Sequence, residues 1–348
     1  EEAIGTTQWY ADVMAIAGLN TIVVKSEDVF GNQSAELSRD FTCVVMAPLT
    51  VNINGDGTVK NNLDGQLLEI GKSYKMTAVH HYTNTVFTNW SHIVNGVTNH
   101  THDLVVKFVM QSNLVLEANF IPNPFLDVAG IYTGLFYPAD GIDHENSGYV
   151  IVKVTPKLGY SGKLMLDGNV ASFSGKWDIS GTVEREVARV KFNKPNLQVN
   201  LALDFVNGTE QITGNVSQNT DWMASLLADR YIWSPTNTPH AFTNSYTMLL
   251  PGLLDPEKGP TGSGYAAVTV NKQGRVKFAG GAADGHPIKQ NGHLSKSGVW
   301  ALYVPMYAEK RTNAQPNGKE VVTKEHQGSL IGWVTLTENT PAGKTHLA

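Results

Sequence analysis

The sequence predicts an all-β protein made of several domains. Short runs of Val, Ile, Thr, Tyr and Phe alternate with Gly, Asn, Asp and Pro along nearly the whole chain, a pattern typical of β-sandwiches and barrels. Charged residues make up only 16% of the 348 residues, which suits short strands and polar turns better than long helices. A chain of this length favours two or three domains. The best helical candidates are Trp9 to Ala17 and Trp222 to Asp229, and the second could equally be a buried strand.

Composition excludes several classes of partner. The net charge of -5 comes without a basic patch, which argues against nucleic acid or an anionic membrane as a partner. No apolar run reaches the roughly 20 residues needed to span a bilayer. The start at Glu1-Glu2 is unlike a signal peptide, although a mature secreted fragment would look the same. Cys43 is the only cysteine, so no intrachain disulfide can form, and we expect it to be a small buried hydrophobe.

Residues 1–46 contain the pattern of two closing strands and a turn. Gly18 to Val24 alternates as a strand does, Phe30-Gly31-Asn32 supplies a turn, and Arg39 to Val45 supplies a second strand. The G-x-N-T-I strand and the D-x-x-G-N turn resemble the last strands of bacterial immunoglobulin-like domains. A full sandwich of that class needs about 90–100 residues. We therefore expect a partial domain here and a chain that begins inside a longer polypeptide.

Residues 47–121 carry four short motifs in a fixed order. They are G-x-G-x-V at Gly55 to Val59, G-x-x-Y-x-M-T-A at Gly71 to Ala78, F-x-x-W at Phe87 to Trp90, and L-x-A-N-F at Leu116 to Phe120. This set resembles the divergent internalin-B-type repeat, a small β-rich surface module, and Trp90 is expected in its core. The following Pro122-Asn123-Pro124 predicts a stiff linker over residues 122–128.

The remainder of the chain contains an internal repeat, which we divide into residues 129–240 and 241–348. Ser147-Gly148-Tyr149 recurs as Ser263-Gly264-Tyr265, 116 residues later. The segments that match are Tyr132 to Pro138 with Tyr246 to Pro251, Gly159 to Leu164 with Gly274 to Ala279, Asp167-Gly168 with Asp284-Gly285, and Ile212 to Ser217 with Leu330 to Thr335. Each copy offers six to eight short antiparallel strands, and two copies could form one closed barrel or a pair of barrels.

Four segments of this tandem repeat resemble a repeat domain of unassigned function from large extracellular proteins of verrucomicrobial and planctomycete-type bacteria. They are Ala129 to Tyr137, His144 to Tyr149, Tyr246 to Gly252 and Leu302 to Tyr307. The resemblance implies surface display and no particular chemistry. Members of that family continue beyond the point where this chain ends, so Glu338 to Ala348 is expected to be a second cut edge.

Three polar clusters could carry chemistry, and each has a simpler structural explanation. Asn52, Asn54 and Asp56 resemble the start of a calcium loop, but residue 63 is Leu where such a loop needs an acidic ligand. Five histidines, at positions 80, 81, 92, 100 and 102, lack the spacing of a metal site and are expected at the surface. Asp140 to Glu145 could supply an acid and a base, but turn chemistry explains it better. We expect no catalytic residue, metal or cofactor.

Aromatic residues of the repeat region are the stronger candidates for ligand binding. An exposed Trp or Tyr on a β-surface can stack on a sugar ring, whereas a buried one fills the barrel interior, and the alternation does not decide between these two. The candidates are Trp177, Trp222, Trp233, Trp300, Tyr303, Tyr307 and Trp333.

Together these observations favour a non-catalytic extracellular segment, structural or adhesive, that displays a β-domain at the cell surface. The alternative is a carbohydrate-binding module of an extracellular glycan-degrading protein, and a hydrolase using Asp140 to Glu145 ranks third. The expected location is secreted or cell-surface. The expected partners are a polysaccharide, another surface protein and the neighbouring domains of a longer polypeptide.

Overall fold

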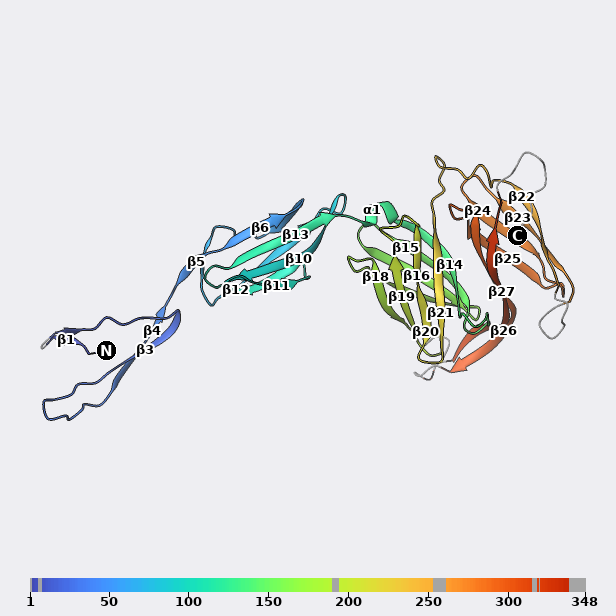
Figure 1. The fold of residues 1–348 in the computed structure, drawn as a ribbon. Coiled ribbons are helices and arrows are strands. Elements are labelled where there is room, and N and C mark those ends of the chain that lie inside the picture. The colour runs from blue at the N-terminus through green and yellow to red at the C-terminus, as the bar shows by residue number, and fades with distance from the viewer. Residues whose placement is uncertain are drawn as a thin grey trace. The chain divides into compact units, whose positions relative to one another are not determined.

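The structure is a computed structural model that describes residues 2–5, 8–189, 194–252, 261–314, 318 and 320–337. It is nearly all β, as predicted, and its one described helix is the single turn α1 (Phe125–Val128). No helix within these residues is long and apolar enough to cross a membrane. The chain divides into two compact units, Glu1–Asn123 and Pro124–Ala348 (Figure 1). Neither helical candidate is helical: Trp222 begins strand β21 (Trp222–Tyr231), and Trp9 begins the short strand β2 (Trp9–Tyr10).

The first unit opens with two small antiparallel pairs. Strand β1 (Ile4–Gly5) pairs with β2, and β3 (Gly18–Val24) pairs with β4 (Leu37–Cys43). The predicted turn lies between β3 and β4, where the Asp28 carboxylate accepts hydrogen bonds from three groups of Phe30 and Asn32 and its pKa is lowered by them. The expectation that Cys43 is buried is wrong, because it lies half-exposed on a two-stranded hairpin.

The rest of the first unit is a compact β-module around the buried Trp90, as expected. Its strands form sheets of order β11-β10-β13-β6, β12-β9-β7 and β5-β8. Their bounds are β5 (Met46–Pro48), β6 (Thr50–Asn54), β7 (Gly57–Lys60), β8 (Leu67–Glu69), β9 (Ser73–His80), β10 (Thr85–Val94), β11 (Val97–Thr101), β12 (Val105–Val109) and β13 (Val115–Pro122). Strand β13 is antiparallel to β10 and parallel to β6.

The glycine pair of the first motif lies against Phe120. A Cβ on Gly55, whose φ is +91°, would meet the Phe120 carbonyl oxygen at 2.4 Å, and a Cβ on Gly57 would meet the Phe120 ring at 2.4 Å. Because the turn passes so closely over this aromatic residue, only glycine fits at either position. The G-x-G spacing and the final aromatic residue of the module are therefore parts of one packing arrangement.

The first repeat is an eight-stranded up-and-down barrel. Each strand pairs with the next one in the chain except β17 and β18, which are in contact without a ladder, and the first strand β14 also pairs with the last strand β21. The bounds are β14 (Gly130–Tyr137), β15 (Gly148–Val154), β16 (Gly159–Leu166), β17 (Asn169–Lys176), β18 (Thr182–Val187), β19 (Leu197–Leu203), β20 (Gln211–Gln218) and β21. Alternate side chains fill the interior, as in other small barrels.

The predicted linker over residues 122–128 is partly wrong. Phe125 is fully buried in the core of the first repeat, and its ring centroid lies 4.9 Å from that of Phe205. The turn α1, which begins at Phe125, belongs to the same packed unit, because Val128 packs against this core as well. An aromatic side chain with this much burial anchors the segment, which proline content alone did not reveal.

The second repeat has its own core and a related strand order. Strands β22 (Ser245–Leu250), β23 (Gly264–Val270), β24 (Arg275–Gly281) and β25 (Pro287–His293) form one antiparallel sheet. The long strands β26 (Val299–Ala314) and β27 (Glu320–Thr335) form a hairpin, and β26 lies against β25. Both sheets contribute to one hydrophobic core.

Equivalent backbone hydrogen bonds show which residues of the two repeats correspond. The Leu203 N–H donates to the Gly181 carbonyl and the Leu336 N–H to the Gly298 carbonyl, both at positive-φ glycines (φ 79° and 78°). Strand β27 therefore corresponds to β19, and the predicted match between Leu330 to Thr335 and Ile212 to Ser217 is wrong. Within the described residues, β20 and β21 have no counterpart in the second repeat.

Candidate binding groove

The two repeats pack through the outer faces of their sheets. Leu135 and Tyr149 of the first repeat are buried against Ala301 and Tyr303 of the hairpin β26–β27. The backbone N–H of Gly168 donates a hydrogen bond to the Tyr303 hydroxyl oxygen at 3.2 Å. Because this contact is apolar at its centre and hydrogen-bonded at its edge, it fixes the second repeat on the first.

A groove of about 580 Å³ lies beside this contact. Its floor is the outer face of β15, β16 and β17, and its wall is the end of β25. Lys153 pairs with Ser161, which pairs with Ser174, and Ile151 pairs with Lys163, which pairs with Ser172. Side chains at alternate positions share one face of a sheet, so these polar groups line the groove together. The lining residues are Ile131, Tyr149, Ile151, Lys153, Ser161, Gly162, Lys163, Met165, Ser172, Phe173, Ser174, Asn291 and His293.

The groove combines positive charge, hydrogen-bonding groups and apolar surface. The side chains of Lys153 and Lys163 are exposed, whereas Ile151 and Met165, on the same face, are half-buried. No carboxylate is present in the lining given by the described residues. An open surface of this kind can pair with an anionic group while its apolar part contacts the faces of rings.

His293 stands in the wall contributed by the second repeat. Its ring lies edge-on to Tyr231, with ring centroids 4.7 Å apart. Burial, and then the nearby charge of Arg275, lower the pKa of His293 below its usual value of 6.5. The imidazole is therefore mostly neutral at pH 7 and gains a proton only in acid, which would add positive charge to the groove.

The seven aromatic candidates occupy other places, and none of them is among the groove residues of the described chain. Trp177 and Trp300 are buried in the cores of the first and second repeats, and Tyr303 is buried in the contact between the repeats. These three have no surface on which a sugar could stack.

The other four aromatic candidates are only partly covered. Trp222 packs against the first core, Trp233 packs against the second, and Trp333 lies at the rim of the contact between the repeats. Tyr307 is 39% exposed and donates a hydrogen bond to the Asp284 carboxylate at 2.6 Å. Tyr307 is thus the most accessible of the seven, and it is tied to a turn of its own repeat.

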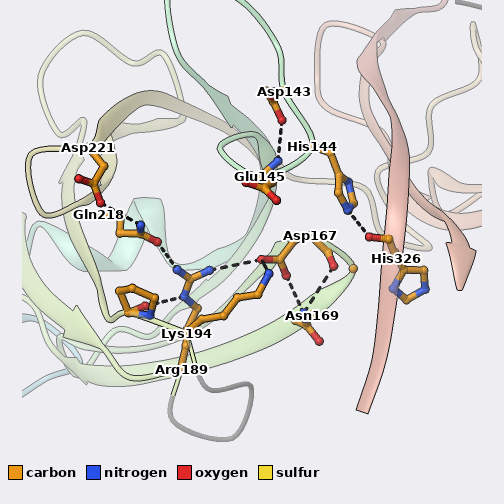
Figure 2. Close-up of polar contacts among 12 residues, drawn as sticks. Asp143, His144, Glu145, Asp167, Asn169, Arg189, Lys194, Gln218, Asp221 and His326 are labelled. Carbon is orange, nitrogen blue, oxygen red and sulfur yellow. Dashed lines mark hydrogen bonds and ion pairs between the residues drawn. The ribbon is translucent and has the colours of Figure 1, made fainter. Parts of the chain in front are cut away.

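A buried polar cluster closes one end of the first barrel (Figure 2). The Asp167 carboxylate, which is 4% exposed, accepts hydrogen bonds from Lys194 at 2.7 Å and from Asn169 at 2.6 Å, and it pairs with Arg189 at 3.5 Å. Arg189 also donates to the Gln218 side chain. Burial lowers the pKa of Arg189, and the Asp167 charge opposes that change. Every oxygen of this carboxylate has a partner, so the cluster acts as a cross-link between turns.

The Asp140 to Glu145 segment makes turn contacts as well (Figure 2). The Asp143 carboxylate accepts the Glu145 N–H at 3.0 Å, and the His144 ring points to the backbone carbonyl of His326 at 2.8 Å. The histidine is thus engaged across the contact between the repeats, and its partner is a carbonyl oxygen rather than a carboxylate.

In the module of the first unit, the histidines and asparagines bind neighbouring strands. His100 contacts the Asn89 amide at 3.0 Å, and His102 contacts the Thr88 carbonyl at 3.0 Å. Asn54 donates across the parallel pair to Asn119 at 2.9 Å. Within the described residues, no group of three or more His, Cys, Asp or Glu side chains is placed to hold a metal ion.

Comparison with known protein families, with curated proteins and with solved structures finds no match for this chain. Sequence reasoning did not identify the groove residues, although a signal exists. Ser or Lys occupies alternate positions in two consecutive strands, at Ser161 and Lys163 in β16 and at Ser172 and Ser174 in β17, which marks one polar outer face.

Proposed function

We propose that this chain is a non-catalytic segment of a secreted or cell-surface protein, and that its groove binds an acidic polysaccharide. The observation that carries the proposal is the pairing of Lys153 and Lys163 with a row of serine hydroxyls over the half-buried Ile151 and Met165. The β-modules of the first unit would serve as a spacer that presents this surface.

The chemistry of the groove favours a sugar over other ligand classes. Sugar rings offer hydroxyls to the Ser161, Ser172 and Asn291 side chains and C–H faces to Ile151 and Met165. Carboxylates or sulfates on the polymer would pair with the two lysines. The groove is open to solvent, so it suits a chain that passes through it better than a small molecule that must be enclosed.

Affinity electrophoresis and calorimetry on the full chain test the proposal, with polygalacturonate, dextran sulfate and neutral dextran as probes. We expect binding of an acidic polymer that weakens as salt is added, because the exposed charges are screened. The Lys153→Ala/Lys163→Ala variant is expected to bind at least about tenfold more weakly, which is the loss of about one charge-assisted contact.

The matched control is Lys75→Ala/Lys107→Ala, which removes two paired, exposed lysines from a sheet of the first unit. It should bind as the parent does. Equal loss in both variants would mean non-specific charge attraction, and absence of binding to either acidic polymer would contradict the proposal. In that case the remaining function is that of a structural or adhesive spacer.

A further inference from the structure

The outer face of strands β23, β24 and β25 repeats the layout of the groove floor. In each repeat a Leu–Tyr pair lies at the same place of the outer face, namely Leu135 with Tyr149 and Leu249 with Tyr265. Beside this pair, two rows of cross-strand partners run over β15 to β17 in the first repeat and over β23 to β25 in the second. The rows of the second repeat are Thr269 with Lys277 and Asn291, and Ala267 with Ala279 and Lys289. Both faces therefore present two lysines beside hydroxyl groups.

The face on the second repeat is basic and continuous with the groove. Asn291 and His293 line the groove, and they also belong to the outer face of β25. Lys277 and Lys289 are exposed on that face, and so is Arg275, which pairs with the strand position of His293. In β22 to β25, all of which the structure describes, no Asp or Glu stands at an outward position. A polyanion that leaves the groove at Asn291 would therefore meet further positive charge.

Tyr265 adds an exposed aromatic ring to this face. It is 68% exposed, whereas its counterpart Tyr149 is 6% exposed because it packs in the contact with the second repeat. Two of the neighbours of Tyr265 on the face are small, Gly281 across the ladder and Ala267 along the strand. Strand spacing places Tyr265 roughly 16 Å from Asn291 over the surface of the sheet, a distance that a polymer can span and a single sugar unit cannot.

We propose that this face is a second subsite for the acidic polysaccharide, where Lys277 and Lys289 pair with its anionic groups and Tyr265 stacks on a sugar ring. The inference rests on the proposed function of the groove and extends the path of the same polymer across the second repeat. A polymer held in the groove reaches the second subsite as an intramolecular contact, which raises the overall affinity. A polypeptide that covered Tyr265 as Tyr303 covers Tyr149 would leave both lysines without a partner, so the charge of the face favours a polyanion.

Calorimetry on the full chain tests the second subsite, with polygalacturonate and dextran sulfate as probes. We expect Tyr265→Ala to weaken binding of the acidic polymer by at least about fivefold, which is the loss of one aromatic contact. Lys277→Ala/Lys289→Ala should weaken it by at least about tenfold. The matched control for the tyrosine is Tyr10→Ala, at a side chain of the first unit that is 63% exposed, and it should bind as the parent does.

Hydroxyl-radical footprinting of the unaltered chain gives a second measurement, which does not depend on whether the variants fold. The bound polymer should slow the oxidation of Tyr265 at least about threefold, because the covered ring loses its access to solvent, and should leave Tyr10 unchanged. Polymer binding that leaves the oxidation of Tyr265 unchanged would overturn the inference.

The variants also separate this inference from the proposed function. Weaker binding in Lys153→Ala/Lys163→Ala, with parental binding in the Tyr265 and Lys277/Lys289 variants, would overturn the second subsite and leave the groove standing. The reverse pattern would support the second subsite and contradict the groove. Absence of polymer binding would overturn both. Pairing of two copies that protects Tyr265 without polymer, or equally tight binding of double-stranded DNA, would assign the face to another partner and overturn the inference.

Discussion

The hydroxyls of Tyr132 and Tyr246 make the same hydrogen bond in the two repeats. Each donates to the backbone carbonyl four residues earlier, Val128 at 2.6 Å and Phe242 at 2.7 Å. Both tyrosines are buried, and burial raises the pKa of each. This contact ties the turn that precedes each repeat to its first strand.

Removing either hydroxyl should destabilise its own repeat. We expect Tyr132→Phe and Tyr246→Phe each to lower the free energy of unfolding by about 1–2 kcal/mol, because a carbonyl loses its donor inside the protein. Urea unfolding followed by tryptophan fluorescence measures the effect. Tyr265→Phe, at a side chain that is 68% exposed, is the control and should change little. Equal effects at all three positions would contradict this explanation.

Removing the buried carboxylate of Asp167 should destabilise the first barrel strongly. Asp167→Ala leaves Arg189 buried without its ion-pair partner, and we expect a loss of about 3–5 kcal/mol in the free energy of unfolding. Asp221→Ala removes an exposed acceptor of Gln218 at the same barrel end and should cost less than about 1 kcal/mol. The comparison requires only chemical denaturation, and similar losses at both sites would show that burial of the pair is unimportant.

A side chain at Gly168 should destabilise the protein more than a side chain at Gly285, the equivalent position of the second repeat. Both Gly168 and Gly285 have positive φ, 75° and 83°, so alanine costs about 1 kcal/mol of backbone strain at either position. At Gly168 the added Cβ would also lie 1.9 Å from the His326 ring, whereas at Gly285 nothing lies within 4 Å. We expect Gly168→Ala to lower the thermal midpoint clearly more than Gly285→Ala. Equal shifts would mean that the turn does not contact β27 in solution.

Stability should fall in mild acid. Burial is the main cause that lowers the pKa of His293 and of His326 below 6.5, so the unfolded chain binds protons more readily than the folded chain does. The stabilisation that this difference represents is complete above about pH 6.5 and is lost as the pH falls toward the folded-state pKa values. Urea titrations between pH 8 and pH 5 should show this decline, and His293→Gln/His326→Gln should flatten it. An unchanged slope in that variant would assign the decline to other groups.

Local patterns predicted the strands well because alternation is a property of consecutive residues. Gly148 to Val154 and Gly264 to Val270 are strands as expected, and the repeat they belong to was visible from Ser147-Gly148-Tyr149. Long-range register was not predictable in the same way. Leu330 to Thr335 alternates like any strand, and only the bond from Leu336 to Gly298 assigns it to the place of β19.

Periodicity could mark the polar face that forms the floor of the groove, but it could not show that the second repeat lies against that face. Lys163 and Ser172 lie in the first repeat and His293 in the second, and their proximity depends on how Tyr149 and Tyr303 pack between the repeats. The sequence also did not show whether Trp177 and Trp300 lie in a core or at the surface, because alternation identifies the two faces of a strand without showing which one is covered. Both tryptophans fill cores.

The parallel pairing of β6 with β13 has a mechanical consequence. Thr50 pairs with Val115 and Asn54 pairs with Asn119, so the chain enters this pair at one end and leaves it at the other. Tension applied through the module therefore loads all the rungs of that ladder at once, in shear. In the first repeat, Ile131 pairs with Tyr231, so its two ends leave side by side and tension breaks the rungs one after another. A pulled chain should thus open its barrel before its small module yields.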